Sequence, residues 1–400
     1  MVSAGKVLLV SLLVVMVSGV SVSGLYVWQL GATVTENAVD ISNGEVDVVV
    51  PQDTIGTFDG GFNVLVVGAD NSAEQAAEFG ERDGAILNDV NIVLHVAADH
   101  ASAVVLSLPR DLVIPHPECV DPTTGEQFDA MSAQDLNTAF NRGGLGCVRS
   151  TVENLTGLSI PYAATFTFAG TVAMSDAVGG VPICVDSPVN DPASGLNLAA
   201  GTTVVSGEQA LAYLRSRKGV GNGSDLSRIS SQQAYMSSLM RVMKSSDTLT
   251  NPSKLLRLAS AAAENVGLSD SLANLNTMAS MALTLKDLDL DKLVFVQFPN
   301  YQDPDNPAKV VPDYDLADQL MSKIGADQPF VLDDGALGSD VTVDPNVPAS
   351  PIAPVAPVAP TTPSTDTPAP TDPAADAPEI LAGLRGQTGS QQTCSVAFRE

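Results

Sequence analysis

Short hydrophobic runs recur between residues 58 and 330 and alternate with longer amphipathic stretches. Each run is a nearly continuous series rich in Val, Ile and Leu, which is typical of a strand buried on both faces. The runs occupy residues 62–67, 91–97, 103–108, 181–185 and 293–298. The stretches between them predict helices at 133–141, 148–155, 169–178, 207–218, 227–243, 252–264 and 271–285. Strands alternating with helices predict an α/β fold, a three-layer αβα domain with a central mixed sheet.

A further hydrophobic run lies near the N-terminus, where residues 7–28 carry no charge. Roughly 20 apolar residues span a bilayer, whereas the apolar part of a cleaved signal peptide has about 7–15. We therefore expect a transmembrane signal-anchor helix at 7–28, with residues 1–6 as a cytoplasmic stub because of Lys6. The protein would then sit in the cell membrane, with an extracellular stalk at 29–57 before the domain. The alternative is a signal peptide cleaved within 21–24, which also exports the rest of the chain.

The C-terminal part of the chain has a different composition. Residues 345–378 hold eleven prolines among Ala, Thr, Val and Asp. Such a segment extends in a polyproline-like conformation because it lacks the side chains for a core. We therefore expect a disordered Pro-rich linker at 339–379, followed by a separate C-terminal segment at 380–400 that carries Cys394.

The composition argues against two kinds of function. The chain has 19 Lys and Arg residues against 46 Asp and Glu, a formal net charge of −27. Nucleic acid is therefore not an expected partner, because affinity for a phosphate backbone comes from clustered cations. Three His residues without an HxxxH pair and four Cys residues without a CxxC pair argue against a zinc site.

Charged side chains lie where the predicted strands begin and end. Asp70 follows the first strand, and Asp89 precedes the second. Arg110 and Asp111 follow the third. Ligands of open α/β sheets bind beyond the carboxyl ends of the strands, and carboxylates without His favour Mg²⁺, with Mn²⁺ as a second candidate. Each residue alone also fits an ordinary role, as a turn residue, a solvated loop carboxylate or an internal ion pair.

Arginines cluster later in the chain, at Arg215, Arg217 and Arg228. The planar guanidinium offers paired donors to phosphate oxygens. Arg228 and Gln232 are about one turn apart and share a helix face. Arg215 and Arg217 reach one ligand only if their helix ends near the glycines of 219–223. With the aspartates, these residues predict a Mg²⁺–pyrophosphate site, although the arginines alone fit equally well as salt-bridge partners in an acidic protein.

Seven segments form an ordered set along the chain: 62–70 (FNVLVVGAD), 107–111 (SLPRD), 137–144 (NTAFNRGG), 151–157 (TVENLTG), 177–181 (AVGGV), 206–217 (SGEQALAYLRSR) and 225–233 (DLSRISSQQ). In this order and spacing they resemble the LytR-CpsA-Psr family. No single segment is decisive, but the ordered set is specific. The resemblance implies a catalytic domain at 58–330 with its motif core at 60–245.

The resemblance implies a phosphorus-group transferase (EC 2.7.8-like) that is anchored in the membrane and acts outside the cell. Such an enzyme attaches a glycopolymer from a polyprenyl-(pyro)phosphate carrier to peptidoglycan during cell-wall assembly. Asp70 and Asp89 match the family's Mg²⁺-associated aspartates. The phosphate-binding positions match Arg110, Arg215, Arg217, Arg228 and Gln232. Arg110, Arg217 and Asp225 are the expected catalytic residues.

The chain departs from the family pattern in its details. The family often has an arginine near the second aspartate, which is missing here, and Arg82 is a candidate replacement. Asp135 stands where Lys is common, and Ser227 where Gly is. Two other functions stay open: a polyprenyl-pyrophosphate phosphohydrolase with water as the acceptor, and a non-catalytic envelope or adhesion protein, which the Pro-rich linker would suit.

The cysteines of an exported chain are expected to be oxidised. Cys119 and Cys147 flank the segment 132–144 and are predicted to form one disulfide. Cys184 and Cys394 remain, and a Pro-rich linker of about 3.1 Å per residue is long enough to return the C-terminal segment to the domain. We therefore predict a second disulfide between them. The alternatives are a buried free thiol at Cys184 and an intermolecular bridge through Cys394.

Overall fold

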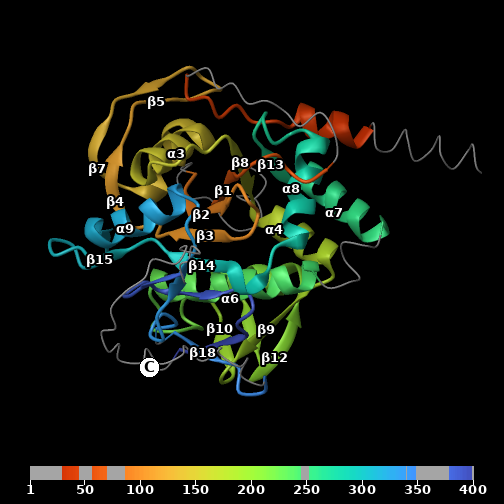
Figure 1. The fold of residues 1–400 in the computed structure, drawn as a ribbon, viewed down its shortest axis with the longest axis vertical. Helices are drawn as coiled ribbons and strands as arrows, with labels where there is room; N and C mark the ends of the chain where they lie inside the picture. The colour runs from red at the N-terminus through yellow and green to blue at the C-terminus, as the bar shows by residue number, and fades with distance from the viewer. Residues whose placement is uncertain are drawn as a thin grey trace, which may run out of the picture.

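The computed structural model describes residues 29–44, 56–69, 86–244, 252–338, 340–347 and 378–398. Its centre is a seven-stranded sheet in the order β13-β8-β1-β2-β3-β14-β20 (Figure 1). The strands are β1 (Phe62–Ala69), β2 (Asn88–Val96), β3 (Ala103–Leu108), β8 (Tyr162–Phe166), β13 (Val266–Leu268), β14 (Leu293–Gln297) and β20 (Gly386–Thr388). β1 is parallel to β8 and β3 to β14, whereas β2 is antiparallel to both of its neighbours, so the sheet is mixed.

Helices cover both faces of this sheet. Successive side chains of a strand point to opposite faces, so Leu65 of β1 packs with α3 and α9, while Val64 packs with α7 and α8. The helices and short 3₁₀ turns include η1 (Leu136–Thr138), α3 (Phe140–Thr156), α4 (Phe168–Val178), α5 (Gly207–Arg215), α6 (Asp225–Lys244), α7 (Pro252–Asn265), α8 (Leu275–Asp287), η2 (Leu290–Lys292) and α9 (Tyr314–Gly325). The mixed α/β fold with a central mixed sheet is confirmed.

A second sheet lies on the other side of α6 from the central sheet (Figure 1). Its order is β12-β9-β21-β18, with β12 (Gly201–Val205), β9 (Val181–Val185), β21 (Thr393–Ser395) and β18 (Val341–Val343). Residues 181–185 were expected in the central sheet, and that expectation is wrong. Val181, Ile183 and Val185 pack instead against Tyr213 of α5 and Tyr235 of α6. An apolar run predicts a strand but does not specify its partner.

Five two-stranded pairs complete the described chain: β4 (Val113–His116) with β7 (Met131–Asp135), β5 (Cys119–Val120) with β6 (Gln127–Phe128), β10 (Val189–Asp191) with β11 (Leu196–Leu198), β15 (Asn300–Gln302) with β16 (Val310–Pro312), and β17 (Phe330–Leu332) with β19 (Glu379–Leu381). The helix predicted at 133–141 is therefore wrong over its first half. Pairing with β4 satisfies the backbone of 131–135, and this long-range contact overrides local propensity.

The C-terminal segment is part of the domain. β20 extends the central sheet at β14, and β21 inserts between β9 and β18 in the second sheet. The predicted domain end at residue 330 is thus too early, because the strands that follow the Pro-rich stretch complete both sheets. Likewise, residues 341–343 of the predicted linker form β18 rather than disordered chain.

The predicted stalk also contributes to the core. Val34 and Ile41 are buried in the two clusters that flank the central sheet, and the backbone N–H of Val39 donates to the Leu268 carbonyl at 2.7 Å. Their apolar side chains explain why 29–44 pack onto the domain. Within the described residues, every helix is too short or too polar to cross a bilayer. The transmembrane helix predicted at 7–28 lies outside the described residues.

Candidate functional site

The strand directions place the predicted site residues at one edge of the central sheet. β1, β3 and β14 run the same way and β2 runs opposite, so the ends of the first three meet the start of β2. Asp89 lies at that start, and Arg110 and Asp111 follow β3 after Pro109. Asp70, which follows β1 in the sequence, and Arg82 both lie outside the described residues.

Arg110 is surrounded by three carboxylates. Its guanidinium pairs with Asp89, and its Nε lies 3.5 Å from Asp111 and 3.6 Å from Asp225. Burial alone would lower the pKa of Arg110, but the three carboxylates outweigh burial, with Asp89 foremost, and the pKa is raised. Arg110 is therefore a fixed positive charge at the end of β3.

Asp225 begins α6 and is the point on which the arginines converge. Its Oδ1 lies 2.6 Å from Arg228 and 3.1 Å from Arg217. Arg228 also donates to the backbone carbonyl of Asp89 at 3.0 Å, which joins α6 to the start of β2. Burial lowers the pKa of Arg228, and the charge of Asp225 opposes that effect. Residues far apart in the chain thus form one charged cluster.

The end of α5 sets the direction of Arg217. The helix stops at Arg215, and Ser216 adopts an extended conformation while its hydroxyl donates to Asp191 at 2.7 Å. The turn away from the helix lets Arg217 reach Asp225, as the glycines of 219–223 predict. Arg215 points elsewhere, with its guanidinium 4.2 Å from the centroid of the Phe168 ring. Its role in phosphate binding stays a prediction.

Gln232 lies next to the cluster and contacts the backbone of α5. Its side-chain amide donates to the Leu214 carbonyl at 3.0 Å, which ties α6 to the last turn of α5. The side chain is buried, at 6% exposure. Gln232 therefore supports the backbone that leads to Arg217, and a direct contact with phosphate stays a prediction.

Three buried atoms of the cluster lack hydrogen-bond partners within the described part of the chain. They are Nε of Arg110, Nε of Arg228 and Oδ2 of Asp225. Buried polar atoms in folded proteins are nearly always hydrogen-bonded, to protein, water or ligand. These two guanidinium N–H groups, which make no hydrogen bond to the described chain, are donors that an anionic ligand with several oxygens can accept from.

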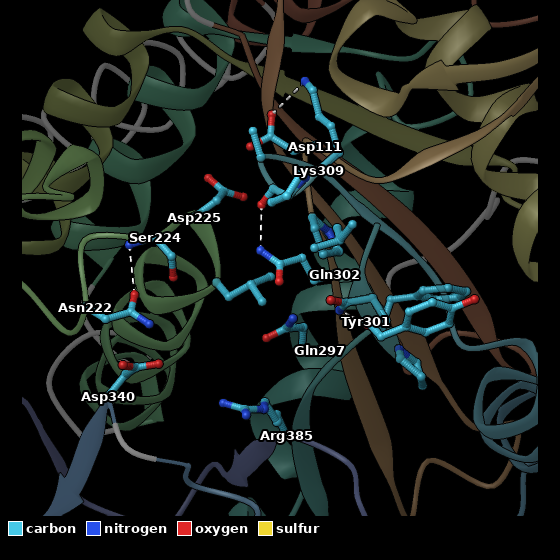
Figure 2. A pocket seen from close by; sticks show the side chains of 18 of the residues that line it. Asp111, Asn222, Ser224, Asp225, Gln297, Tyr301, Gln302, Lys309, Asp340 and Arg385 are labelled. Atoms are coloured by element: carbon cyan, nitrogen blue, oxygen red, sulfur yellow. Dashed lines mark hydrogen bonds and ion pairs between the residues drawn. The ribbon is translucent and has the colours of Figure 1, made fainter. Parts of the chain in front are cut away.

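A cavity of about 670 Å³ opens beside this cluster. Figure 2 shows Asp225 on one side of it and Asp111 with Lys309 across from it. Lys309 pairs with Asp135 and lies 3.7 Å from Asp111. Sequence reasoning missed Lys309, and it missed three other lining residues, Gln297, Asp340 and Arg385. They come from segments outside the motifs, so no local sequence pattern identified them as site residues.

Three features agree with a comparison of the whole sequence with known families. They are the ordered motifs, the three arginines around Asp225 and the mixed sheet. The LytR_cpsA_psr family model matches residues 26–319. The chain belongs to the LytR_cpsA_psr family. The solved LytR-Csp2A-Psr enzyme from Actinomyces oris has a similar fold, with a TM-score of 0.51 at 23% identity, over 70% of this chain and 94% of that one.

The curated proteins similar to this LytR_cpsA_psr chain include LcpA and TagV. The cell wall biosynthesis protein LcpA of Corynebacterium glutamicum is 32% identical over 265 residues, which is 60% of this chain and 50% of LcpA. The polyisoprenyl-teichoic acid–peptidoglycan teichoic acid transferase TagV of Bacillus subtilis is 28% identical over 210 residues, 51% of this chain and 49% of TagV. The chain thus spans about half the length of each relative.

Both disulfides predicted for this LytR_cpsA_psr protein are present. Cys119 and Cys147 join β5 to α3, and Cys184 and Cys394 join neighbouring strands β9 and β21. Neither a free thiol at Cys184 nor an intermolecular bridge through Cys394 is found. The second bridge ties the C-terminal segment to the second sheet, and this segment carries Arg385 to the rim of the cavity.

Proposed function

We propose that this protein transfers a glycopolymer from a polyprenyl-(pyro)phosphate carrier to peptidoglycan. The observation that carries the proposal is the convergence of Arg110, Arg217 and Arg228 on one carboxylate at the edge of the sheet. Guanidinium groups held in fixed positions stabilise the charge on phosphoryl oxygens without reorganising during the reaction. The family and the named activity of the relative TagV support this class of reaction.

The charges of the cluster support a divalent cation as cofactor. Three arginines face three carboxylates, Asp89, Asp111 and Asp225, so the protein groups are close to neutral. A pyrophosphate therefore brings negative charge that the side chains do not fully balance. Carboxylate oxygens suit Mg²⁺ or Mn²⁺, and Asp89 with Asp70 would hold the ion. When bound, it would supply positive charge next to the phosphoryl oxygens.

The residues of the chain have distinct tasks in this reaction. Arg110 and Arg217 contact the phosphoryl group, and Arg228 adds a buried positive charge behind them. Asp225 holds all three arginines and is a positioning residue. A sugar hydroxyl of the acceptor attacks the phosphorus that carries the polymer, a new P–O bond forms, and the bond to the lipid phosphate breaks. The polyprenyl phosphate leaves with the electron pair and takes up the hydroxyl proton.

We also propose that the protein acts outside the cell, attached to the membrane by residues 7–28. A lipid carrier stays in the bilayer, so an enzyme tethered there meets its donor without searching the surrounding solution. The two disulfides support an oxidising compartment for the domain.

The test uses the purified full chain with a lipid-linked glycopolymer, Mg²⁺ and peptidoglycan, and it measures polymer bound covalently to the wall. Arg217→Gln removes one contact to the phosphoryl group, and we expect the rate to fall by about 100-fold or more. Lys218→Gln is the matched control, because Lys218 is the exposed cation next in sequence and does not line the cavity. Equal rates for the two variants would contradict the proposal.

A further inference from the structure

The outer part of the cavity holds two polar side chains that have no partner among the described residues. We call it the outer subsite, and it is lined by Gln297, Asp340 and Arg385. Gln297 is 4% exposed and Asp340 is 6% exposed. Within the described residues, neither side chain makes a hydrogen bond or an ion pair. Figure 2 shows both directed into the cavity, from opposite sides.

Both residues are mostly covered by the protein, and their polar ends face the cavity, where water or a ligand can reach them. Such groups in native proteins are satisfied by protein, by ordered water or by a ligand. Here both open into the same cavity as Arg217 and Asp225. Their position indicates a site that is completed by a bound molecule.

The backbone keeps the outer subsite in place. Gln297 ends β14, and its backbone N–H donates to the carbonyl of Arg385 at 2.8 Å. Asp340 precedes β18, and its carbonyl accepts from the N–H of Val396 at 2.9 Å. Both contacts involve the C-terminal segment, which the Cys184–Cys394 bridge fixes to the second sheet. Gln297 lies at the end of a strand, and Asp340 and Arg385 each directly precede one, so paired strands hold the subsite in place.

The charges of the lining residues exclude two classes of ligand, phosphates and metal ions. Asp340 would repel a phosphate, and the exposed guanidinium of Arg385, which has no ion-pair partner in the described chain, would repel a metal ion. Asp340 accepts hydrogen bonds, Arg385 donates them, and the Gln297 amide can do either. This combination matches the hydroxyl and amide groups of a sugar ring. Tyr301, 53% exposed at the rim, offers an apolar ring face for stacking.

We propose that the outer subsite binds an uncharged sugar ring of a saccharide chain and holds that chain against the arginine cluster. The inference rests on the proposed function, since the same cavity contains Arg217 and Asp225. A sugar bound between Gln297 and Asp340 directs the rest of its chain toward the phosphoryl group. Two sources share this chemistry, the glycan of the acceptor and the polymer of the donor.

Direct binding tests the subsite without any transfer reaction. The full chain in detergent is titrated with chitotetraose, a chain of N-acetylglucosamine, and binding is followed by calorimetry. Asp340→Asn and Gln297→Ala should each weaken binding about tenfold or more, the loss expected for a buried hydrogen bond to a ligand. Asp318→Asn, an equal charge change on the exposed face of α9, should leave binding unchanged. No binding by the wild type, or equal binding by Asp340→Asn, would overturn the inference.

Pyrophosphate binding in the presence of Mg²⁺ separates this inference from the proposed function. Asp340→Asn should keep wild-type affinity for pyrophosphate, whereas Arg217→Gln should lose it. In the transfer assay, a raised KM for peptidoglycan in Asp340→Asn assigns the subsite to the acceptor, and a raised KM for the lipid-linked polymer assigns it to the donor. An unchanged KM for both substrates would overturn the inference while leaving the transferase proposal intact.

Discussion

Asp225 is the carboxylate shared by the arginines of the site, and Asp225→Asn removes its charge while keeping its shape. The pair with Arg228 is the closest, at 2.6 Å, and the two side chains are 10% and 7% exposed. The substitution therefore leaves a buried guanidinium without its main counter-charge. Arg228 keeps its hydrogen bond to the Asp89 carbonyl, so the loss is not complete.

The size of the effect follows from the burial of each pair. Removing one partner of a buried ion pair costs about 3–5 kcal/mol. The pair with Arg217, whose side chain is 35% exposed, adds at most about 1 kcal/mol. Arg110 keeps Asp89 and Asp111 as partners. Because Arg228 keeps its hydrogen bond to the Asp89 carbonyl, the loss from the buried pair should lie near its lower limit, and we expect Asp225→Asn to lower the free energy of unfolding by about 3–4 kcal/mol in total.

Urea unfolding followed by circular dichroism measures this loss. A double-mutant cycle of Asp225→Asn with Arg228→Met isolates the pair, and we expect a coupling of about 2–3 kcal/mol. Asp318→Asn, on an exposed surface, should change stability by less than about 0.5 kcal/mol. A loss below about 1 kcal/mol for Asp225→Asn, or strictly additive effects in the cycle, would refute the reasoning that Asp225 organises the cluster.

Two further predictions concern stability away from the site. His116 is buried beside Arg142, and burial first and Arg142 second lower its pKa from 6.5 to about 4. The free energy of unfolding should therefore fall by up to about 3 kcal/mol as pH falls from 6.5 to 4, because the unfolded chain takes up this proton first. His116→Gln should remove this contribution to the pH dependence of unfolding, and an unchanged pH dependence would contradict the prediction. Replacing Cys184 and Cys394 together by Ser opens a loop of 210 residues, and the chain-entropy model predicts a loss of about 5 kcal/mol. Limited proteolysis should then cut first within 378–398, and equal protease resistance would contradict the prediction.

The charged cluster was largely predictable because simple rules connect its members. Asp89 and Arg110 flank strand ends, and strand ends in an α/β sheet meet at one edge. Arg217 follows the end of a helix, where glycines allow the chain to turn. Arg228 and Asp225 are three residues apart at the start of α6 and therefore share a helix face. Local spacing and strand order together bring these residues to one place.

The outer subsite was not predictable from local pattern. Asp340 and Arg385 lie on either side of the Pro-rich stretch, in segments that join the domain only by pairing with strands far away in sequence. The second sheet was missed for the same reason, because the run at 181–185 predicts a strand without specifying its neighbours. Long-range strand pairing depends on packing of the whole domain, which hydrophobic periodicity does not contain.

Oxygen tracing in the transfer reaction tests the central claim most directly. The wild-type chain is incubated with lipid-linked glycopolymer, Mg²⁺ and peptidoglycan in water labelled with heavy oxygen (¹⁸O), and the phosphate on the polymer is analysed by mass spectrometry. Attack by a sugar hydroxyl predicts polymer joined to peptidoglycan through a phosphate that contains no ¹⁸O. Polymer phosphate that carries one ¹⁸O, with nothing bound to the wall, would show attack by water and contradict the account.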